Sequence, residues 1–300
     1  MTAGVLVSGG TGFVGRFIVE ALLANGYPVS VGGRHPPPSG YFSGPVGFRP
    51  LDLDPGLDQS VAFHGFEFFV HAALQHVEGK FRGGEGNDPL GFRRANLAGS
   101  VRLFEEARDG GVRRCVFLSS RAVYGTCPVG TILDETTPAR PDTLYGTVKR
   151  GGEQELRALS CPGFATASLR VTGVYGPAGA GRNDKWRALF ADYLSGRPVA
   201  PRVATEVHGT DVASAVRLML EADARSIDRQ VYNVSDLLLD RHDLLAIVQS
   251  ATGSSFPLPD RADPATINAM TTAKIRELEW QPGGWPLLKR TVRELLDDLH

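Results

Sequence analysis

Residues 5–19 read VLVSGGTGFVGRFIV, and this stretch decides the fold class of the chain. The apolar run at 5–7 predicts a buried strand, and apolar residues return at helical spacing after the glycines. Gly9 lets a tight turn form, Gly12 lets the backbone approach a pyrophosphate, and Gly15 lets the helix pack closely on the strand. The stretch therefore predicts a strand, a turn and a helix that bind a dinucleotide.

The first turn of that helix supplies groups that can hold phosphates. Backbone amides of residues such as Phe13 and Val14 point out of the helix N-terminus, where the helix dipole also favours negative charge. A flexible glycine linker is the alternative interpretation. It is disfavoured because a strand and a helix lie on the correct sides of the glycines.

Short apolar runs alternate with helical patterns through the first half of the chain. The expected strands lie at 5–7, 29–31, 46–51, 66–70, 115–118 and 164–170, and the expected helices at 15–24, 89–108 and 143–159. This alternation predicts a doubly wound α/β fold, in which helices cover both faces of a parallel sheet.

The pattern changes in the second half. It predicts helices at 185–194, 211–221 and 240–251 and at the C-terminus, with strands near 206–207 and at 231–234. We expect residues 1–172 plus 203–235 to form the dinucleotide-binding domain, so that the strand near 206–207 joins the large sheet. Residues 173–202 plus 236–300 then form a small, discontinuous, mainly helical substrate domain.

Tyr145 and Lys149 lie four residues apart on the expected helix 143–159. This spacing places both side chains on one helix face, where an ammonium can stabilise a phenolate and lower a phenol pKa of about 10. Taken alone, such a pair is more often a core aromatic beside a solvated lysine. Ser120 follows the fifth strand, however, so its hydroxyl should lie at the carboxyl edge of the sheet, where doubly wound folds bind ligands. Ser119 is the alternative candidate for the serine whose hydroxyl takes part in the reaction.

Together these features resemble the extended short-chain dehydrogenase/reductases, the NAD-dependent epimerase/dehydratase family. The matching motifs are GGTGFVG at 9–15, HAA at 71–73, NLAGS at 96–100, SSRAVYG at 119–125, the Tyr145 and Lys149 pair, LR at 169–170, VYGP at 174–177, and VH at 207–208 before DVA at 211–213. The resemblance covers nearly the whole chain and implies a Rossmann fold. It also implies that Ser120, Tyr145 and Lys149 are catalytic, with Lys149 binding the nicotinamide ribose.

The end of the second strand bears on the choice of cofactor. An NAD-selective site usually carries an acidic residue there, whereas this chain has Arg34. A guanidinium can bind a phosphate, so we expect NADP to be preferred, with NAD possible and Arg16 as a second cation within reach. Solvated arginines are the alternative. The resemblance adds four more residues to the cofactor site: Asp52, Leu53, Ala72 and Ala73.

Departures from the family motifs bear on the substrate. Sugar dehydratases of the family carry an Asp-Glu pair after the catalytic Ser or Thr, and Arg121 with Ala122 here argues against dehydration. Many nucleotide-sugar enzymes carry Asn before the Val-Tyr-Gly-Pro run and Arg before the Val-His motif. Gly173 stands in place of the Asn, and Ala204 with Thr205 stands in place of the Arg, which weakens the case for a nucleotide-diphosphate substrate. The candidate substrate residues are Arg121, Gln75 and Gly173. Four cations lie near the loop that follows residues 71–73: Lys80, Arg82, Arg93 and Arg94. They could recognise an anionic group of the substrate, or they could be ordinary charged residues in contact with solvent.

The composition argues against several other classes of protein. The chain has 32 Lys and Arg against 33 Asp and Glu, so no basic surface predicts binding to nucleic acid or an anionic membrane. No run approaches the roughly 20 apolar residues of a membrane span. Three scattered cysteines do not form a disulfide framework, and His64, His71 and His76 lack a metal-binding spacing. We expect a cytoplasmic protein with reduced thiols and no metal.

The sequence therefore predicts an NAD(P)-dependent oxidoreductase that acts on a hydroxyl or carbonyl of a sugar or sugar-like substrate. The main alternative is an epimerase, which would use the same three residues and retain its NAD. A non-catalytic NADP-sensing regulator is a further alternative, against which the intact Ser-Tyr-Lys set argues. The resemblance also implies a homodimer, formed through the helices at 96–108 and 143–159.

Overall fold

The structure is a computed structural model that describes residues 3–77, 80, 83–179, 182 and 184–297. Its large sheet has seven parallel strands in the order β3-β2-β1-β4-β5-β6-β9. They are β1 (Val5–Ser8), β2 (Val29–Gly33), β3 (Gly47–Pro50), β4 (Phe68–His71), β5 (Arg114–Ser120), β6 (Ala165–Val171) and β9 (Gln230–Val234). The strand order reverses between β1 and β4, which creates a crevice at the carboxyl edge beside the glycine-rich turn.

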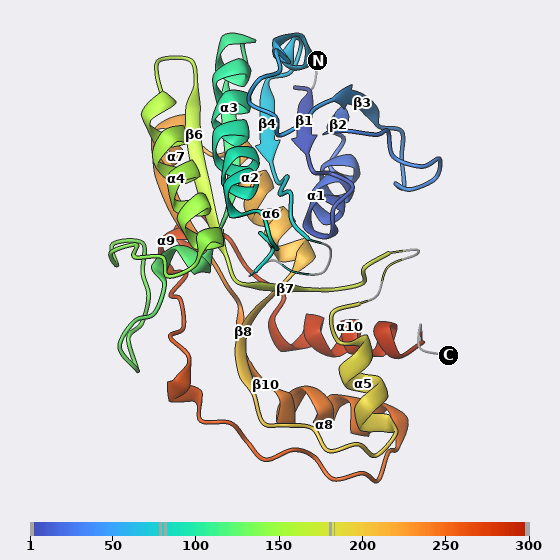
Figure 1. The fold of residues 1–300 in the computed structure, drawn as a ribbon. Coiled ribbons are helices and arrows are strands. Elements are labelled where there is room, and N and C mark those ends of the chain that lie inside the picture. The colour runs from blue at the N-terminus through green and yellow to red at the C-terminus, as the bar shows by residue number, and fades with distance from the viewer. Residues whose placement is uncertain (1–2, 78–79, 81–82, 180–181, 183, 298–300) are drawn as a thin grey trace.

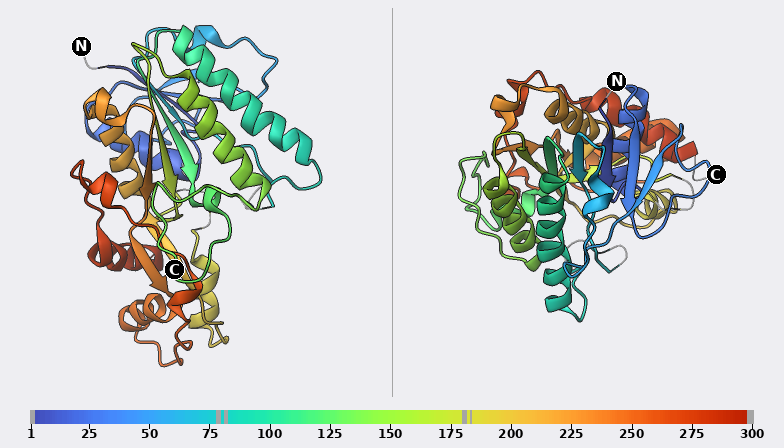
Figure 2. Two further views of the ribbon diagram at one scale, coloured as in Figure 1. Left: turned by 90° about the vertical axis from the view of Figure 1, so that its left-hand side faces the viewer. Right: turned by 90° about the horizontal axis from the view of Figure 1, so that it is seen from above.

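Helices cover both faces of this sheet, which confirms the doubly wound fold (Figures 1 and 2). One face carries α1 (Phe13–Ala24), α6 (Gly209–Glu221) and α7 (Ala224–Ile227), and the other carries α2 (Pro89–Arg93), α3 (Ser100–Asp109) and α4 (Leu144–Leu159). Alternate residues of β1 enter different cores, since Val5 and Val7 pack with Ile18 whereas Leu6 packs with Phe104.

The helix expected at 89–108 is divided. Between α2 and α3, residues Arg94–Gly99 form a π-helical segment, η2. A Cβ added to Gly99 would lie 2.0 Å from the carbonyl oxygen of Leu53, so the backbone passes very close to the segment after β3. The segment also directs Asn96 towards the loop after β4, where its side chain bonds Gln75.

A smaller unit follows β6 and lies below the carboxyl edge of the large sheet in Figure 1. Its three-stranded sheet has the order β10-β8-β7, built from β7 (Gly173–Tyr175), β8 (Val203–His208) and β10 (Leu237–Asp240). Its helices are α5 (Arg187–Leu194), α8 (Arg241–Thr252) and α10 (Gly284–Asp297), and the short α9 (Ala273–Arg276) lies beside β9. The core of the unit contains Trp186, Phe190 and Leu244.

The placement of the strand near 206–207 in the large sheet was wrong. β8 pairs with β7 and β10, because β9 occupies the free edge of β6 and β7 offers β8 a new edge. Helix α6, which directly follows β8, does return to the large sheet and packs against α1. After β6 the chain thus leaves the large sheet for β7, α5 and β8, and returns to it with α6.

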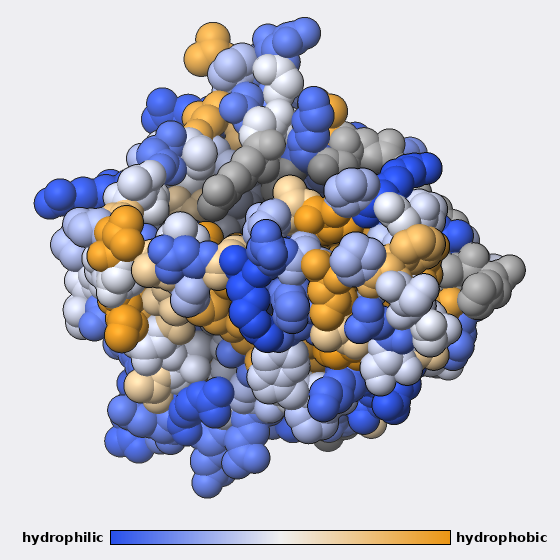
Figure 3. All heavy atoms as spheres, turned by 90° about the horizontal axis from the view of Figure 1, so that it is seen from below, coloured by the Kyte–Doolittle hydropathy of each residue, from blue (hydrophilic) through white to orange (hydrophobic). Residues whose placement is uncertain are grey.

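Seen from the end formed by the smaller unit, the surface mixes charged and apolar residues (Figure 3). Leu238 and Phe256, both 39% exposed, are among the apolar residues that remain accessible in this unit. Within the described part of the chain, none of the helices combines the length and the apolar character that crossing a bilayer requires.

Candidate active site

The glycine-rich turn forms a tight connection between β1 and α1. Gly9 has a φ of 68°, and a Cβ there would lie 2.7 Å from the backbone of Ala73. A Cβ on Gly15 would lie 2.1 Å from the carbonyl oxygen of Gly9, so the helix rests directly on the turn. Gly12 is the N-cap of α1 and supplies no side-chain cap, which leaves first-turn amides available to an external anion.

Ser120, Tyr145 and Lys149 lie on two elements that pack together. Ser120 is the last residue of β5 and stands in register with Val171 of β6, while Tyr145 and Lys149 lie on the first two turns of α4. The Lys149 ammonium is buried and donates a hydrogen bond to the carbonyl oxygen of Leu118 at 2.7 Å. Its nitrogen lies 5.9 Å from the centre of the Tyr145 ring, so the lysine connects the end of β5 with the tyrosine.

A second close contact holds the start of α4 against the turn after β5. Thr143 caps the helix by accepting a hydrogen bond from the amide of Gly146 at 3.1 Å. A Cβ on Gly146 would lie 2.4 Å from the carbonyl oxygen of Ala122, in the short helix η3 (Arg121–Tyr124). Glycine at this position therefore permits the approach that brings Tyr145 to the end of β5.

Burial controls the charge of Lys149. Loss of water lowers the pKa of its ammonium from 10.5 to about 8, and the negative charge of Glu153 partly opposes that shift. Glu153 lies one turn further along the same face of α4. The ammonium is therefore still largely protonated at neutral pH.

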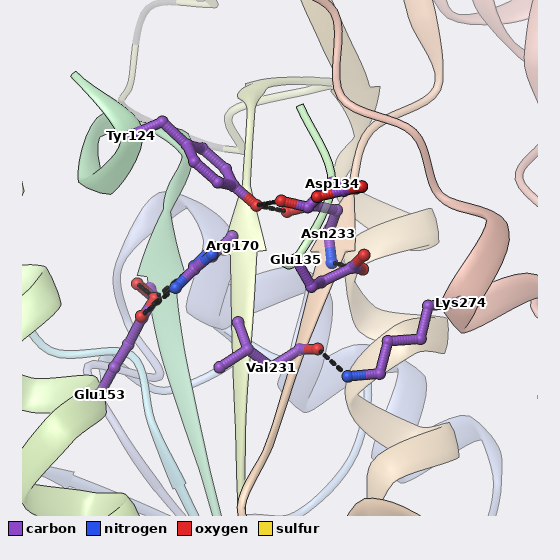
Figure 4. A network of polar contacts seen from close by, with 9 residues as sticks. Tyr124, Asp134, Glu135, Glu153, Arg170, Val231, Asn233 and Lys274 are labelled. Carbon is purple, nitrogen blue, oxygen red and sulfur yellow. Dashed lines mark hydrogen bonds and ion pairs between the residues drawn. The ribbon is translucent and has the colours of Figure 1, made fainter. Parts of the chain in front are cut away.

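Glu153 belongs to a buried polar network beneath the site (Figure 4). Its carboxylate pairs with Arg170 of β6 at 2.8 Å, and both side chains are almost completely buried. The Ser119 hydroxyl donates to the same carboxylate, so Ser119 points away from the crevice into the core. Arg170 also lies 4.7 Å above the Tyr124 ring, and the Tyr124 hydroxyl donates to Asn233 of β9 at 2.7 Å.

The expected adenosine end of the cofactor site is an open cavity of about 880 Å³. It begins at Gly33 and Arg34, at the end of β2, and extends along the segment after β3 that contains Asp52. Arg34 is exposed, whereas the backbone amide of Asp52 donates a hydrogen bond of 2.6 Å to the side-chain oxygen of Gln59. Ala72 lies at the opposite side of the turn, where its amide donates to Ser8 at 3.1 Å.

The other predicted cofactor residues have different environments. Leu53 is buried in the core of the sheet face that carries α3. The guanidinium of Arg16 donates to the carbonyl oxygen of Pro177, so this side chain points towards the smaller unit. Its Nε atom is buried without a hydrogen-bond partner.

The predicted substrate residues are only partly brought together. Arg121 donates to the carbonyl oxygen of Asn268 at 2.8 Å and ties η3 to a distant segment. Gln75 is exposed, and the side chain of Asn96 fixes its backbone through two hydrogen bonds of 2.7 Å. Gly173 starts β7, beside an ion pair between Lys185 and Glu206.

The cations near the loop after β4 have different environments where the structure describes them. Arg94 pairs with Asp54 at 2.6 Å, Arg93 and Lys80 are exposed, and Arg82 lies outside the described residues.

Two histidines that the sequence singled out are packing residues. His71 is fully buried between the hydroxyls of Ser8 and Ser100, and burial lowers its pKa to about 3, with a further decrease from the charge of Lys149. His208 caps α6 through the amide of Thr210, and burial lowers its pKa to about 4. Across the described residues, no group of three His, Cys, Asp or Glu side chains is arranged to hold a metal ion.

Sequence reasoning missed several residues of this site. Glu153 was detectable, since it lies four residues after Lys149 and eight after Tyr145 on one helix face. The ion pair between Arg170 and Glu153 could not be detected in the sequence, because Arg170 lies on a strand and Glu153 on a helix, and only the fold brings the two side chains together.

This arrangement has known relatives. The NAD dependent epimerase/dehydratase family model matches residues 5–235. The chain belongs to this family. It is therefore an enzyme of the short-chain dehydrogenase/reductase type with a nicotinamide cofactor.

Individual relatives extend the comparison. The UDP-glucose 4-epimerase of Corynebacterium glutamicum is 27% identical, over 93% of this chain and 90% of that enzyme. The mouse UDP-glucose 4-epimerase is 32% identical, over 70% of this chain and 66% of that enzyme. Among solved structures, the Thermus thermophilus UDP-glucose 4-epimerase in complex with NAD is 29% identical, with 99% and 98% of the two chains covered and a TM-score of 0.76. MoeE5 in complex with UDP-glucuronic acid and NAD, at 24% identity and a TM-score of 0.78, has the same fold over 99% of both chains.

Proposed function

We propose that this protein oxidises a hydroxyl, or reduces a carbonyl, of a sugar-like substrate, and that Ser120, Tyr145 and Lys149 carry out the proton chemistry. The observation that supports this most directly is the buried Lys149 ammonium, which bridges the carbonyl of Leu118 and the ring of Tyr145 at the end of β5. Neither a purely structural lysine nor a sensor has any need for this placement beside a phenol.

Each residue has a separate task in this proposal. Tyr145 exchanges the proton of the reacting hydroxyl, Ser120 donates a hydrogen bond to the reacting oxygen, and the charge of Lys149 favours the phenolate form of Tyr145. When bound, the nicotinamide supplies the hydride acceptor or donor. Glu153 keeps the lysine charged, and the network with Arg170 fixes its direction.

The residues present fit such a cofactor. The uncapped N-terminus of α1 and the close turn at Gly9 and Gly12 suit a pyrophosphate. We further propose that NADP is preferred, because Arg34 stands at the end of β2 where an NAD-selective site carries an acid. Asp52 and Asp58 are the carboxylates of this cavity, and both come from the segment after β3.

Epimerisation is the second candidate, favoured by the UDP-glucose 4-epimerases among the relatives. A turnover screen of sugars, sugar acids and sugar phosphates with NAD and NADP separates the two. Net formation of reduced cofactor, with cofactor that is lost on gel filtration, supports oxidoreduction. Conversion of one sugar to its epimer, with cofactor that stays bound through purification, supports the epimerase.

We also propose a cytoplasmic homodimer that pairs through α3 and α4. The proposal of a reducing compartment rests on the small number of cysteines, and Cys115, Cys127 and Cys161 are free thiols in the structure. Leu103 and Phe104 of α3 are buried in their own core, so a partner would meet the opposite, partly exposed side of α3 together with the exposed side of α4.

A further inference from the structure

Phe117 of β5 presents the face of its ring to the ammonium of Lys149. The Lys149 nitrogen lies over this ring, 4.7 Å from its centre, which is closer than the 5.9 Å to the centre of the Tyr145 ring. Phe117 and Lys149 are both buried, with exposed fractions of 1% and 5%. The negative face of an aromatic ring attracts a cation, and the attraction is larger where water is excluded.

The surroundings of Phe117 fix the direction of its ring. Phe104 of α3 contacts the ring edge-on, with ring centroids 5.5 Å apart, and His71 of β4 stacks on it at 5.7 Å. A Cβ on Gly152 would lie 2.9 Å from two carbon atoms of the ring, so glycine at this position lets α4 rest against Phe117. Turning the ring away from Lys149 would therefore disturb three packed neighbours.

The ionisable groups around Lys149 compensate its charge only in part. Glu153, one turn further along α4, favours the ammonium, but its carboxylate also pairs with Arg170 of β6 at 2.8 Å. His71 is neutral at working pH, because burial lowers its pKa to about 3. The Leu118 carbonyl accepts a hydrogen bond from one of the three N–H groups of the ammonium. A ring face against the ammonium can stabilise the remaining charge.

We propose that the face of the Phe117 ring holds the Lys149 ammonium beside Tyr145 and stabilises its charge, so that Phe117 is a positioning residue for the reaction. This inference rests on the proposed function for the role of Lys149 in catalysis. The contact between the ring and the ammonium is tested without any turnover.

Simple packing is the competing explanation of this contact. A ring that only fills space contributes to stability through its shape, whereas attraction of a cation depends on the electron density of the ring face. Phe117→Leu does not separate the two, because it leaves a cavity and also changes the burial of the lysine. Fluorine atoms on the ring do separate them, since they withdraw electrons from the face and nearly preserve the shape.

The test replaces Phe117 of the full chain, by site-specific incorporation, with phenylalanines that carry one, two or three ring fluorine atoms. NMR signals of lysines labelled with carbon-13 at the ε position report the pKa of Lys149. The chain has five lysines, and Lys149→Arg identifies the signal. The pKa should fall with each added fluorine, by about 1 over the series, which is about a tenfold loss in the ratio of charged to neutral lysine.

The same series tests the link between Phe117 and the reaction. The pH at which kcat declines on the alkaline side should fall together with the pKa of Lys149. Well below that pH, the lysine stays charged in every variant, so kcat and cofactor affinity should match the wild type and report an intact fold.

Phe63 is the matched control, because it is buried in the same core and its ring packs against Phe69, with ring centroids 5.0 Å apart. Fluorinated residues at position 63 should leave the pKa of Lys149 and the pH profile unchanged. The inference is overturned if the pKa of Lys149 does not fall along the Phe117 series, or if it falls equally along the Phe63 series. If the pKa falls as expected but the activity profile does not move, or no sugar is turned over, the proposed role of Lys149 in the reaction is contradicted and the contact with Phe117 stands.

Discussion

At the scale of single residues, Lys149 links the structure to the chemistry. A buried ammonium is costly unless other groups compensate, and here the Leu118 carbonyl and the charge of Glu153 do so. The compensation is incomplete, because the pKa still falls to about 8. The lysine therefore titrates close to working pH, which has measurable consequences.

Replacing Tyr145 with Phe should lower turnover by about 10² to 10⁴, the usual contribution of a general acid or base. Cofactor affinity should stay nearly intact, since the phenol oxygen is the only group removed. Steady-state kinetics and cofactor titration measure the two effects. Lys149→Ala should damage both turnover and cofactor binding.

Tyr27→Phe is the matched control for the tyrosine. Its hydroxyl donates a hydrogen bond of 2.9 Å to Glu221. Tyr27 precedes β2 and therefore lies at the amino edge of the sheet, opposite the edge that carries the crevice. Turnover of this variant should match the wild type. A loss of less than tenfold in Tyr145→Phe would remove Tyr145 from its proposed role.

Activity should fall as pH rises through about 8, because Lys149 loses its charge there. The contribution of Lys149 to stability should change in the opposite direction to activity and increase as pH rises. Between about 8 and the unfolded value of 10.5, the unfolded chain binds more protons at Lys149 than the folded chain does, so the free energy of unfolding gains from rising pH. Profiles of kcat and of melting temperature against pH test both signs.

Glu153→Gln should move the alkaline limb of that activity profile to lower pH, because Glu153 raises the pKa of Lys149. Glu155→Gln, on the exposed side of the same helix, is the control and should leave the profile in place. Circular dichroism checks folding, since Glu153→Gln also breaks the buried pair with Arg170. If the Glu153→Gln protein is folded and its activity declines at the same alkaline pH as the wild type, the ionisation of Lys149 does not cause that decline.

Replacing Arg34 with Gln should weaken NADP binding more than NAD binding, by about 1.5 to 3 kcal/mol, the size of one charge-assisted hydrogen bond. Arg113→Gln is the control, because Arg113 pairs with Glu67 at the amino edge of the sheet. Fluorescence titration with both cofactors gives the difference. Equal losses for the two cofactors, or a native preference for NAD, would refute the assignment.

At the scale of elements, the sequence predicted the long periodic segments well and the short ones poorly. The helix expected at 240–251 is α8, and Asp240 caps it by accepting a hydrogen bond from the amide of His242. Thr272 precedes α9 but makes no side-chain cap. The strands β7 and β10 escaped prediction, since β7 has three residues and starts at Gly173, and their pairing with β8 joins distant segments. The sequence left Ser119 as an alternative to Ser120, and the structure gives a reason to prefer Ser120 in the Ser119 contact with Glu153.

Replacing Gly146 with Ala tests whether the approach of α4 to η3 matters for the chemistry. The new methyl group would collide with the Ala122 carbonyl at 2.4 Å and push the start of α4 away from β5. Misplacement of about 1 Å can cost up to about 10²-fold in rate, so kcat should fall by that order. Stopped-flow or steady-state assays measure the loss.

Gly151→Ala on the same helix is the comparison. Its added methyl would meet only the end of the flexible Leu97 side chain, at 2.9 Å, and alanine favours a helix by about 1 kcal/mol over glycine. This variant should keep its activity and melt at an equal or higher temperature. Equal loss of activity in both variants would mean that general helix perturbation, not the contact with η3, explains the result.

At the scale of the whole molecule, the site is a junction between two units. The large sheet supplies the glycine turn, Ser120 and the α4 pair, while the smaller unit supplies the ion pair of Lys185 and Glu206 beside Gly173. The two are joined by direct continuity, since β7 follows β6 after a single residue. Trp280 adds a buried link, because its indole nitrogen donates to the Asp211 carbonyl at 3.0 Å. Such continuity could not be read from composition or periodicity, because it depends on which strand edge each segment meets.

Assembly is the last property to test. If α3 and α4 pair across a two-fold axis through the exposed side of α4, which includes Ala158, an arginine at this position should disrupt the self-complementary surface. Light scattering at micromolar concentration should give twice 32.2 kDa for the wild type and 32.2 kDa for Ala158→Arg. Ala251→Arg, an exposed alanine of α8, should leave the mass unchanged. A monomeric wild type that is fully active would refute the dimer, and a dimer that tolerates Ala158→Arg would move the interface to another face. A dimer lost in Ala158→Arg, together with a reduced kcat, would show that pairing also steadies the helix that carries Tyr145 and Lys149.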